Sequence, residues 1–299
     1  AICGISEDEI RLQMKDDLGG LAKKLEITPE EALMKLKENY DGYHFTSPSP
    51  DIYNPFSLLN AFADGKFGSY WFGSGTPTYL VKMLDKFGVK PSEIGRRQLK
   101  SSVFDAPTET MTDAVPLLYQ SGYITIKDYN KMLDLYTLDI PNKEVRLGLM
   151  ESLLPYYVNN KTPEATTMVA YLFYDIQNGD MDAALHRLQE FLSTIPYCDN
   201  TRFEGHYQQV FYIIFSLLGY YVDVEVRTPR GRVDIVLRTK TTLYVMELKL
   251  DKSAGEAMEQ IDLKNYPERF ALCGLPVVKV AVSFDSERCT IGDWEIINA

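Results

Sequence analysis

The sequence predicts a multi-domain protein that combines an α+β region, made mostly of helices, with a C-terminal α/β domain. Apolar residues recur at helical spacing through most of residues 1–200. A single strand-rich stretch, residues 114–139, interrupts this pattern. In the last hundred residues the predicted helices and strands follow the order α-β-β-β-α-β, which is typical of a sheet covered by helices. We therefore divide the chain into domains 1–150, 151–200 and 201–299.

Domain 1–150 begins with helical patterns. Apolar residues between positions 10 and 25 follow a helical period. The run Thr28-Pro29-Glu30-Glu31 then supplies a cap, a proline at the first helical position and an acidic first turn, as helix starts do. Residues 46–56 contain three prolines and are predicted as a loop. Further helices are expected at residues 57–65, 76–88 and 142–158.

The stretch 114–139 is predicted to be a helix followed by a β-hairpin. Strand-like residues lie on both sides of Asn130, and Gly122 marks the turn that ends the helix. This order favours a small winged-helix-like module within the N-terminal region.

Residues 151–200 are predicted as a helical linker of two helices, which are split at Asn178-Gly179-Asp180 and end before Pro196. The domain that follows carries the α-β-β-β-α-β pattern. Its elements are expected at residues 204–220, 221–228, 232–239, 243–250, 253–270 and 276–284.

Composition excludes some classes of protein. The formal net charge of −11 argues against a generally basic nucleic-acid binder, although residues 201–299 are nearly neutral. No run of eighteen apolar residues occurs, so we expect no membrane partner. The chain starts without a signal-peptide pattern, and its four cysteines are scattered, which favours a cytoplasmic protein without a zinc site. Because the first residue is not Met, a preceding segment is expected.

Three charged residues stand out in two strand-like segments. Asp234 lies in RVDIVL, and Glu247 and Lys249 close TLYVMELKL, where charge is costly. Glu247 and Lys249 are two residues apart and share a strand face. If the two strands are antiparallel neighbours, Asp234 and Glu247 meet and repel each other unless a proton or a cation lies between them. Mg²⁺ (or Mn²⁺) suits such oxygens and can activate water for hydrolysis.

An ordinary structural role is the alternative for these residues. Asp234, Glu247 and Lys249 could form a salt-bridge ladder on an exposed edge strand, because an Asp followed by Glu-X-Lys is common by chance. The surrounding Val, Ile, Leu, Tyr and Met residues favour the catalytic reading. We therefore treat all three as candidate catalytic residues, and the two acids as candidate metal ligands.

The segment from Phe203 to Phe284 resembles the PD-(D/E)XK nuclease superfamily. The resemblance is carried by FEGHYQQVFYIIFSLLG, RGRVDIVL, YVMELKL and AMEQIDLKNY. It implies a restriction-endonuclease-like core, with Asp234 and Glu247 as the metal-binding acidic pair and Lys249 as the catalytic lysine. It also implies a further metal contact from Glu204 in the first core helix.

The same resemblance implies residues that support the site or contact nucleic acid. Gln260 and Tyr266 match a Gln-X(n)-Tyr element, and Arg230 and Arg232 could bind phosphate. Each has a simpler interpretation: Glu204 as a favourable charge at a helix start, Gln260 and Tyr266 as ordinary helix residues, and the arginines as exposed turn residues. Further along the helix, Lys264 and Arg269 could be solvated.

Residues 1–150 resemble the C-terminal, lid and winged-helix-like part of an AAA-ATPase-like domain of the Bacteroidetes type. The matching segments are ENYDGYHF, IYNPFSLLNAF, YWFGSGTPTYL, LLYQSGYITI and IPNKEVR. No GxxxxGK[ST] phosphate-binding loop is present, and the glycine-rich run 73–76 lacks its lysine. The resemblance thus implies that ATP is contacted only through an upstream core, before Ala1.

These observations lead to one main functional expectation and two alternatives. The main one is a metal-dependent nuclease, with DNA as the expected substrate, joined to the lid of a truncated ATPase. The second is a non-catalytic regulatory or interaction module with a vestigial site, which the acidic balance favours. The third is a solute-binding domain that uses the aromatic residues of segment 40–80. The sequence leaves the oligomeric state open.

Overall fold

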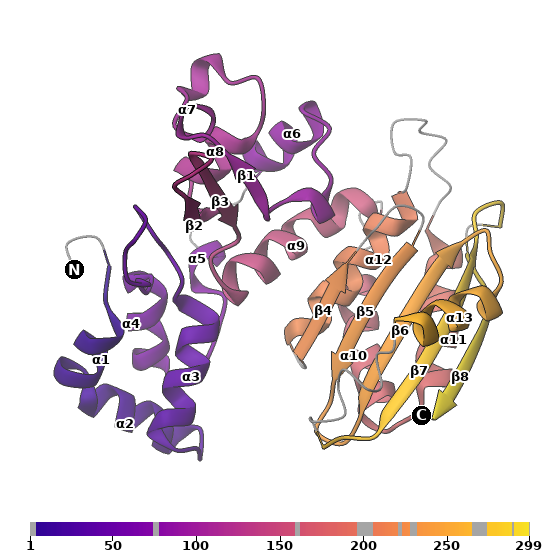
Figure 1. Ribbon diagram of the computed structural model, residues 1–299. Coiled ribbons are helices and arrows are strands. Elements are labelled where there is room, and N and C mark those ends of the chain that lie inside the picture. The colour runs from indigo at the N-terminus through magenta and orange to yellow at the C-terminus, as the bar shows by residue number, and fades with distance from the viewer. Residues whose placement is uncertain are drawn as a thin grey trace. The chain divides into compact units, whose positions relative to one another are not determined.

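The computed structural model describes residues 4–73, 78–158, 162–195, 206–220, 223–227, 232–264, 274–288 and 290–298 (Figure 1). The chain forms two compact units, Ala1–Ser152 and Leu153–Ala299, here called unit 1 and unit 2. The fold is a mixture of helices and sheets. No helix within the described ranges is long and apolar enough to cross a membrane.

Unit 1 is mostly helical, as its sequence pattern predicts. The expected helical segment near the N-terminus is divided at Met14, whose φ of −115° and ψ of 26° are not helical. Ser6 and Glu9, and likewise Thr28 and Glu31, form capping boxes at the starts of the first and third helices. The α-helices are α1 (Glu7–Gln13), α2 (Lys15–Lys24), α3 (Pro29–Tyr40), α4 (Pro55–Asp64), α5 (Tyr70–Gly73), α6 (Thr78–Lys86), α7 (Ser101–Phe104), α8 (Val115–Gln120) and α9 (Lys143–Tyr157), with the 3₁₀ turns η1 (Pro91–Glu93) and η2 (Thr108–Thr110).

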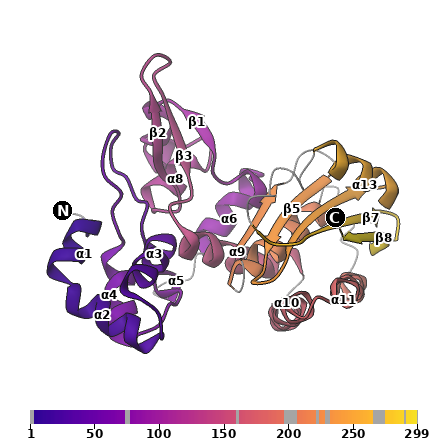
Figure 2. The same ribbon diagram turned by 60° about the horizontal axis from the view of Figure 1, so that its bottom comes forward.

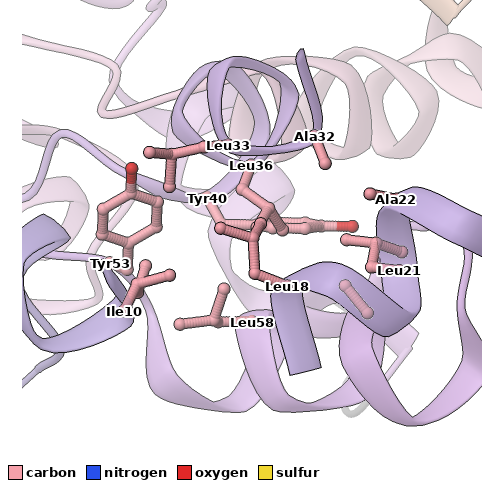
Figure 3. Packing of buried hydrophobic residues seen from close by; sticks show 11 residues of the cluster. Ile10, Leu18, Leu21, Ala22, Ala32, Leu33, Leu36, Tyr40, Tyr53 and Leu58 are labelled. Carbon is pink, nitrogen blue, oxygen red and sulfur yellow. The ribbon is translucent and has the colours of Figure 1, made fainter. Parts of the chain in front are cut away.

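A hydrophobic core joins α1 to α4. Figure 3 shows its side chains pointing toward one another from these helices, with Leu18, Leu36 and Leu58 among them. The ring of Tyr40 is fully buried, and its hydroxyl bonds to the backbone of Gly68, accepting from the amide at 2.9 Å and donating to the carbonyl at 3.0 Å. The buried phenol is therefore satisfied at its polar end, as buried tyrosines usually are.

A small sheet completes unit 1. Its strands β1 (Arg97–Leu99), β2 (Thr125–Asn130) and β3 (Leu135–Asp139) are antiparallel in the order β1-β3-β2. The helix α8 precedes the β2–β3 hairpin, so the expected helix and hairpin are both present. The assignment to a winged-helix module stays a prediction.

The turn after α3 gives a test of unit 1. Gly42 has φ of +93°, and a Cβ there would overlap the carbonyl oxygen of Pro141. Gly88 also has a positive φ, +62°, but a Cβ there would meet nothing within 4 Å. We expect Gly42→Ala to destabilise unit 1 by about 1–3 kcal/mol more than Gly88→Ala, because only Gly42 adds overpacking to backbone strain. Urea denaturation would measure this, and equal losses would contradict it.

Unit 2 is built on a five-stranded sheet. The strands are β4 (Asp223–Arg227), β5 (Arg232–Arg238), β6 (Leu243–Leu250), β7 (Val277–Asp285) and β8 (Thr290–Asn298), in the order β4-β5-β6-β7-β8. Among the strand pairs that the structure describes here, only β6–β7 is parallel, and α13 (Ala254–Leu263) lies between those two strands in the chain. The predicted α-β-β-β-α-β order is thus present from α12 (His206–Leu217) to β7. The edge strand β8 was not anticipated.

Helices cover both faces of this sheet. Figure 2 shows α13 on one face and α10 (Thr162–Gln177) and α11 (Met181–Thr194) on the other. On the α13 face, Ala257 and Ile261 pack with Val245 of β6. On the opposite face Phe211 of α12 meets Phe284 of β7, with ring centroids 5.5 Å apart. The 3₁₀ turn η3 (Leu218–Tyr220) ends α12.

Candidate functional site

Asp234 and Glu247 lie directly opposite each other in the middle of the sheet. The β5–β6 pair is antiparallel, and its register pairs Asp234 with Glu247 and Val236 with Val245. Residues paired in this way project from the same face, which here is the face that packs against α13. Only 8% of Asp234 and none of Glu247 is exposed. The sheet therefore holds two carboxyl groups side by side, largely out of water.

A lysine from α13 lies between these two carboxyl groups. Lys264 Nζ is 2.8 Å from Asp234 Oδ2 and 2.8 Å from Glu247 Oε2. Its side chain is 19% exposed. Burial lowers the pKa of Lys264, but the hydrogen bonds to Asp234 and Glu247 outweigh this effect and raise the pKa above its ordinary value. The ammonium is therefore charged at neutral pH and balances the acidic pair.

The helix α13 positions this lysine. Ser253 and Glu256 form a capping box that fixes its start, directly after β6. At the other end, Lys264 is the C-cap residue and its backbone amide bonds to the carbonyl of Gln260, 3.1 Å away. Because Ala257 and Ile261 are buried against the sheet, the last turn is held close to the carboxyl groups.

Lys249 contacts α13. Its Nζ donates to the backbone carbonyl of Glu256 at 3.0 Å and to Gln260 Oε1 at 3.4 Å. Since Lys249 follows Glu247 by two residues, both side chains leave β6 on the same face. The structure thus gathers Asp234, Glu247, Lys249 and Gln260 on one face of unit 2.

The structure describes the other predicted site residues only in part. Glu204, Arg230 and Tyr266 lie outside the described residues. Arg232 is the first residue of β5 and pairs in register with Lys249.

The sequence leaves open that Lys264 is solvated, but the structure places its side chain in ion pairs with Asp234 and Glu247. A signal for its true position was present, because Lys264 follows Gln260 by four residues. Positions four apart share a helix face, and Gln260 was already expected to face the site. A lysine on that face was therefore a candidate partner of the acidic pair.

The donor set fits a hard divalent cation. No group of three or more His, Cys, Asp and Glu side chains suited to a metal occurs among the described residues. Two carboxylates are nevertheless enough for Mg²⁺, which commonly keeps several waters and adds oxygens from a substrate phosphate. The position of Lys264 Nζ, in contact with both acids, shows that the pair accommodates a cation.

Comparison with known proteins identifies part of the chain. Residues 202–294 match the family model described as the PD-(D/E)XK nuclease superfamily, so unit 2 contains a domain of that superfamily. Over 308 aligned positions, which include 98% of the chain, it is 30% identical to the "Uncharacterized protein in vnfD 5'region" of Azotobacter chroococcum mcd 1. The chain spans 56% of the length of that relative. No solved structure gives a significant match.

Proposed function

Because residues 202–294 form a PD-(D/E)XK nuclease superfamily domain, we propose that unit 2 is a metal-dependent nuclease that hydrolyses phosphodiester bonds. The observation that carries the proposal is the pairing of Asp234 with Glu247 across β5 and β6, with both residues buried. A cation between two such carboxylates removes their mutual repulsion when both are ionised. Mg²⁺ or Mn²⁺ is the proposed cofactor, with Asp234 and Glu247 as its protein ligands and Glu204 as a further candidate.

Each part of the site has its own role in the proposed chemistry. A divalent metal at this site would make a bound water more acidic and would draw negative charge from a phosphate. Lys249 is proposed to orient or deprotonate the attacking water, or to stabilise the negative charge that develops on the reacting phosphate. Gln260 and the carbonyl of Glu256 hold its ammonium on the face that carries Glu247. Gln260 is therefore proposed as a positioning residue.

The proposed substrate is a nucleic acid, and DNA is the first choice. The superfamily match supports a nucleic-acid substrate, and residues 201–299 avoid the strong negative charge of the rest of the chain. Arg230, Arg232 and Tyr266 stay proposed contacts to the substrate.

Unit 1 is proposed to be the lid and winged-helix-like part of an AAA-ATPase-like protein. Its support is the order of α8 and the β2–β3 hairpin, together with the sequence resemblance. In this proposal ATP is bound only by a core outside the 299 residues.

A second candidate is a non-catalytic interaction module. It is favoured by one specific observation: Lys264 already neutralises Asp234 and Glu247 without a metal. In that case the pair would be a structural ion cluster, and the fold would serve binding alone.

Cleavage assays separate these candidates. Labelled single- and double-stranded DNA and RNA would be incubated with the protein and Mg²⁺, Mn²⁺ or a chelator. We expect cleavage only with metal, and loss of cleavage in Asp234→Asn and Glu247→Gln, which keep side-chain size and remove charge. Equal rates of cleavage in wild type and both variants would contradict the proposal. Absence of cleavage combined with absence of saturable Mn²⁺ binding in calorimetry would favour the non-catalytic module.

A further inference from the structure

Lys264 lies at the place where a metal ion shared by Asp234 and Glu247 would lie. One nitrogen atom contacts an oxygen of each carboxylate, both at 2.8 Å. Mg²⁺ binds carboxylate oxygens at about 2.0–2.1 Å. An ammonium and a divalent ion that used the same two oxygens would be like charges in close contact. The two cations are therefore mutually exclusive at this pair.

Without a metal, the lysine has a clear energetic role. Two carboxylates that are 8% and 0% exposed would repel each other strongly if both were ionised in a region of low dielectric. The charged ammonium removes that repulsion and donates hydrogen bonds to both acids. Charged hydrogen bonds of this kind are among the stronger ones in proteins. The metal-free fold is thus stabilised by Lys264.

We propose that Lys264 is an exchangeable counter-ion, which neutralises Asp234 and Glu247 in the metal-free protein and leaves them when a divalent metal binds. This inference rests on the proposed nuclease function. Lys264 then sets the metal affinity of the site, because each binding event includes the loss of its two ion pairs. Lys264 is the C-cap residue of α13 and lies outside the buried cluster that holds Ala257 and Ile261, so movement of its side chain would leave that packing in place.

A permanent structural ion pair is the competing view, and it makes different predictions. If Lys264 never leaves the carboxylates, the wild-type protein binds no divalent metal at this pair, and the metal binds only after the lysine is removed. If Lys264 is exchangeable, the wild-type protein itself binds the metal, and removal of the lysine makes that binding tighter and destabilises only the metal-free protein. Saturable metal binding by the wild-type protein therefore separates the two views, and a metal that binds only the Lys264 variants would overturn the inference.

The test compares wild type with Lys264→Met in Mn²⁺ calorimetry and in thermal unfolding. Methionine keeps the length and apolar stem of the side chain and removes the charge. We expect Mn²⁺ affinity to rise roughly 10- to 100-fold, because the metal no longer displaces a charged hydrogen-bond donor. Without metal, the unfolding midpoint of unit 2 should fall by roughly 5–15 °C, and saturating Mn²⁺ should recover most of that loss.

Lys279→Met is the matched control. Lys279 Nζ is 2.8 Å from Asp262 Oδ1 of α13, and its side chain is also 19% exposed, but it contacts neither Asp234 nor Glu247 in the described structure. The Lys279→Met variant should bind Mn²⁺ with the same affinity as wild type. If Lys264→Met cannot be prepared without metal, Lys264→Gln gives the same comparison, since it keeps hydrogen-bond donors and lacks the charge.

The outcomes distinguish this inference from the proposed function. If wild type and the Lys264 variants bind Mn²⁺ equally well, the counter-ion inference is overturned and the proposed nuclease stands. If neither binds Mn²⁺, both fail. A variant-free readout is the ¹⁵N-ammonium NMR signal of Lys264, which should shift when Mg²⁺ saturates the wild-type protein. An unchanged signal at saturation would also overturn the inference.

Discussion

Lys249→Met is expected to slow the proposed metal-dependent cleavage by about 10²- to 10⁴-fold, the range typical of a lost acid–base group. The variant should still bind Mn²⁺, because Asp234 and Glu247 remain. Its fold should also remain, because Lys249 donates only to the carbonyl of Glu256 and to Gln260 Oε1 in the described contacts. The expected change in free energy of unfolding is below about 1.5 kcal/mol, the usual range for such hydrogen bonds.

Lys252→Met is the control for this variant. Lys252 lies three residues later, pairs with Glu256 Oε1 at 3.1 Å and is 54% exposed at its side chain. It removes the same charge from the same region, so a general loss of nucleic-acid attraction would appear in both variants. Only Lys249→Met should lose the chemical step under single-turnover conditions.

The opposite result would reassign the lysine. If Lys249→Met cleaves at the wild-type rate while Lys264→Met does not, then Lys264 supplies the ammonium for catalysis. Such a result would contradict the role that the Glu-X-Lys pattern implies for Lys249.

The order of elements in unit 2 could be predicted because each strand is short, apolar and bounded by turn residues. Residues 232–238 and 243–250 are examples, with Lys240 and Thr241 between them. The edge strand β8 was missed because its burial is irregular, with one buried residue, Ile291, and mostly exposed residues after it. Edge strands lack the alternation that marks a half-buried strand. Their pairing is decided by the neighbouring strand, here β7.

The two acidic residues of the site could be predicted from the sequence, but the lysine that neutralises them was harder to predict. Asp234 and Glu247 stand out because charge within an apolar strand needs a reason. Lysines on helices are commonly exposed, so the residue type of Lys264 did not distinguish it. Its role depends on the distance from the end of α13 to the sheet, which is a tertiary property. Gln260 gave a partial signal, because it shares a helix face with Lys264.

Unit 1 contains a buried acid that should control its stability with pH. Asp41 is 2% exposed at the end of α3, and its Oδ1 has no hydrogen-bond partner among the described residues. Burial raises the pKa of Asp41 from 3.8 to about 6. A hydrogen bond from the Gly42 amide and the charges of Lys37 and Lys127 act in the opposite direction, but their effects are smaller than that of burial. The neighbouring charge of Asp51 adds to the rise.

The direction of the pH effect follows from this raised pKa. The folded state keeps the proton of Asp41 up to about pH 6, whereas the unfolded state releases it near pH 3.8. The stabilising contribution of protonated Asp41 is therefore complete below about pH 4 and is lost as the pH rises through 6. The difference between the two pKa values corresponds to about 3 kcal/mol, the full size of the loss above pH 7.

Asp41→Asn is expected to remove this pH dependence, since the amide has the shape of the protonated acid and does not titrate. The quantity to follow is the free energy of unfolding of the variant minus that of wild type. This difference should increase by up to about 3 kcal/mol from pH 4 to pH 8. Urea denaturation from pH 4 to 8 would measure it in a Trp294→Phe background, where Trp71 reports on unit 1 alone because the chain has 2 tryptophans. Asp85→Asn, at an exposed position of α6, is the control and should show no such trend. A difference between Asp41→Asn and wild type that stays constant with pH would show that Asp41 is ionised in the folded protein, and that its burial is compensated by Lys37 and Lys127.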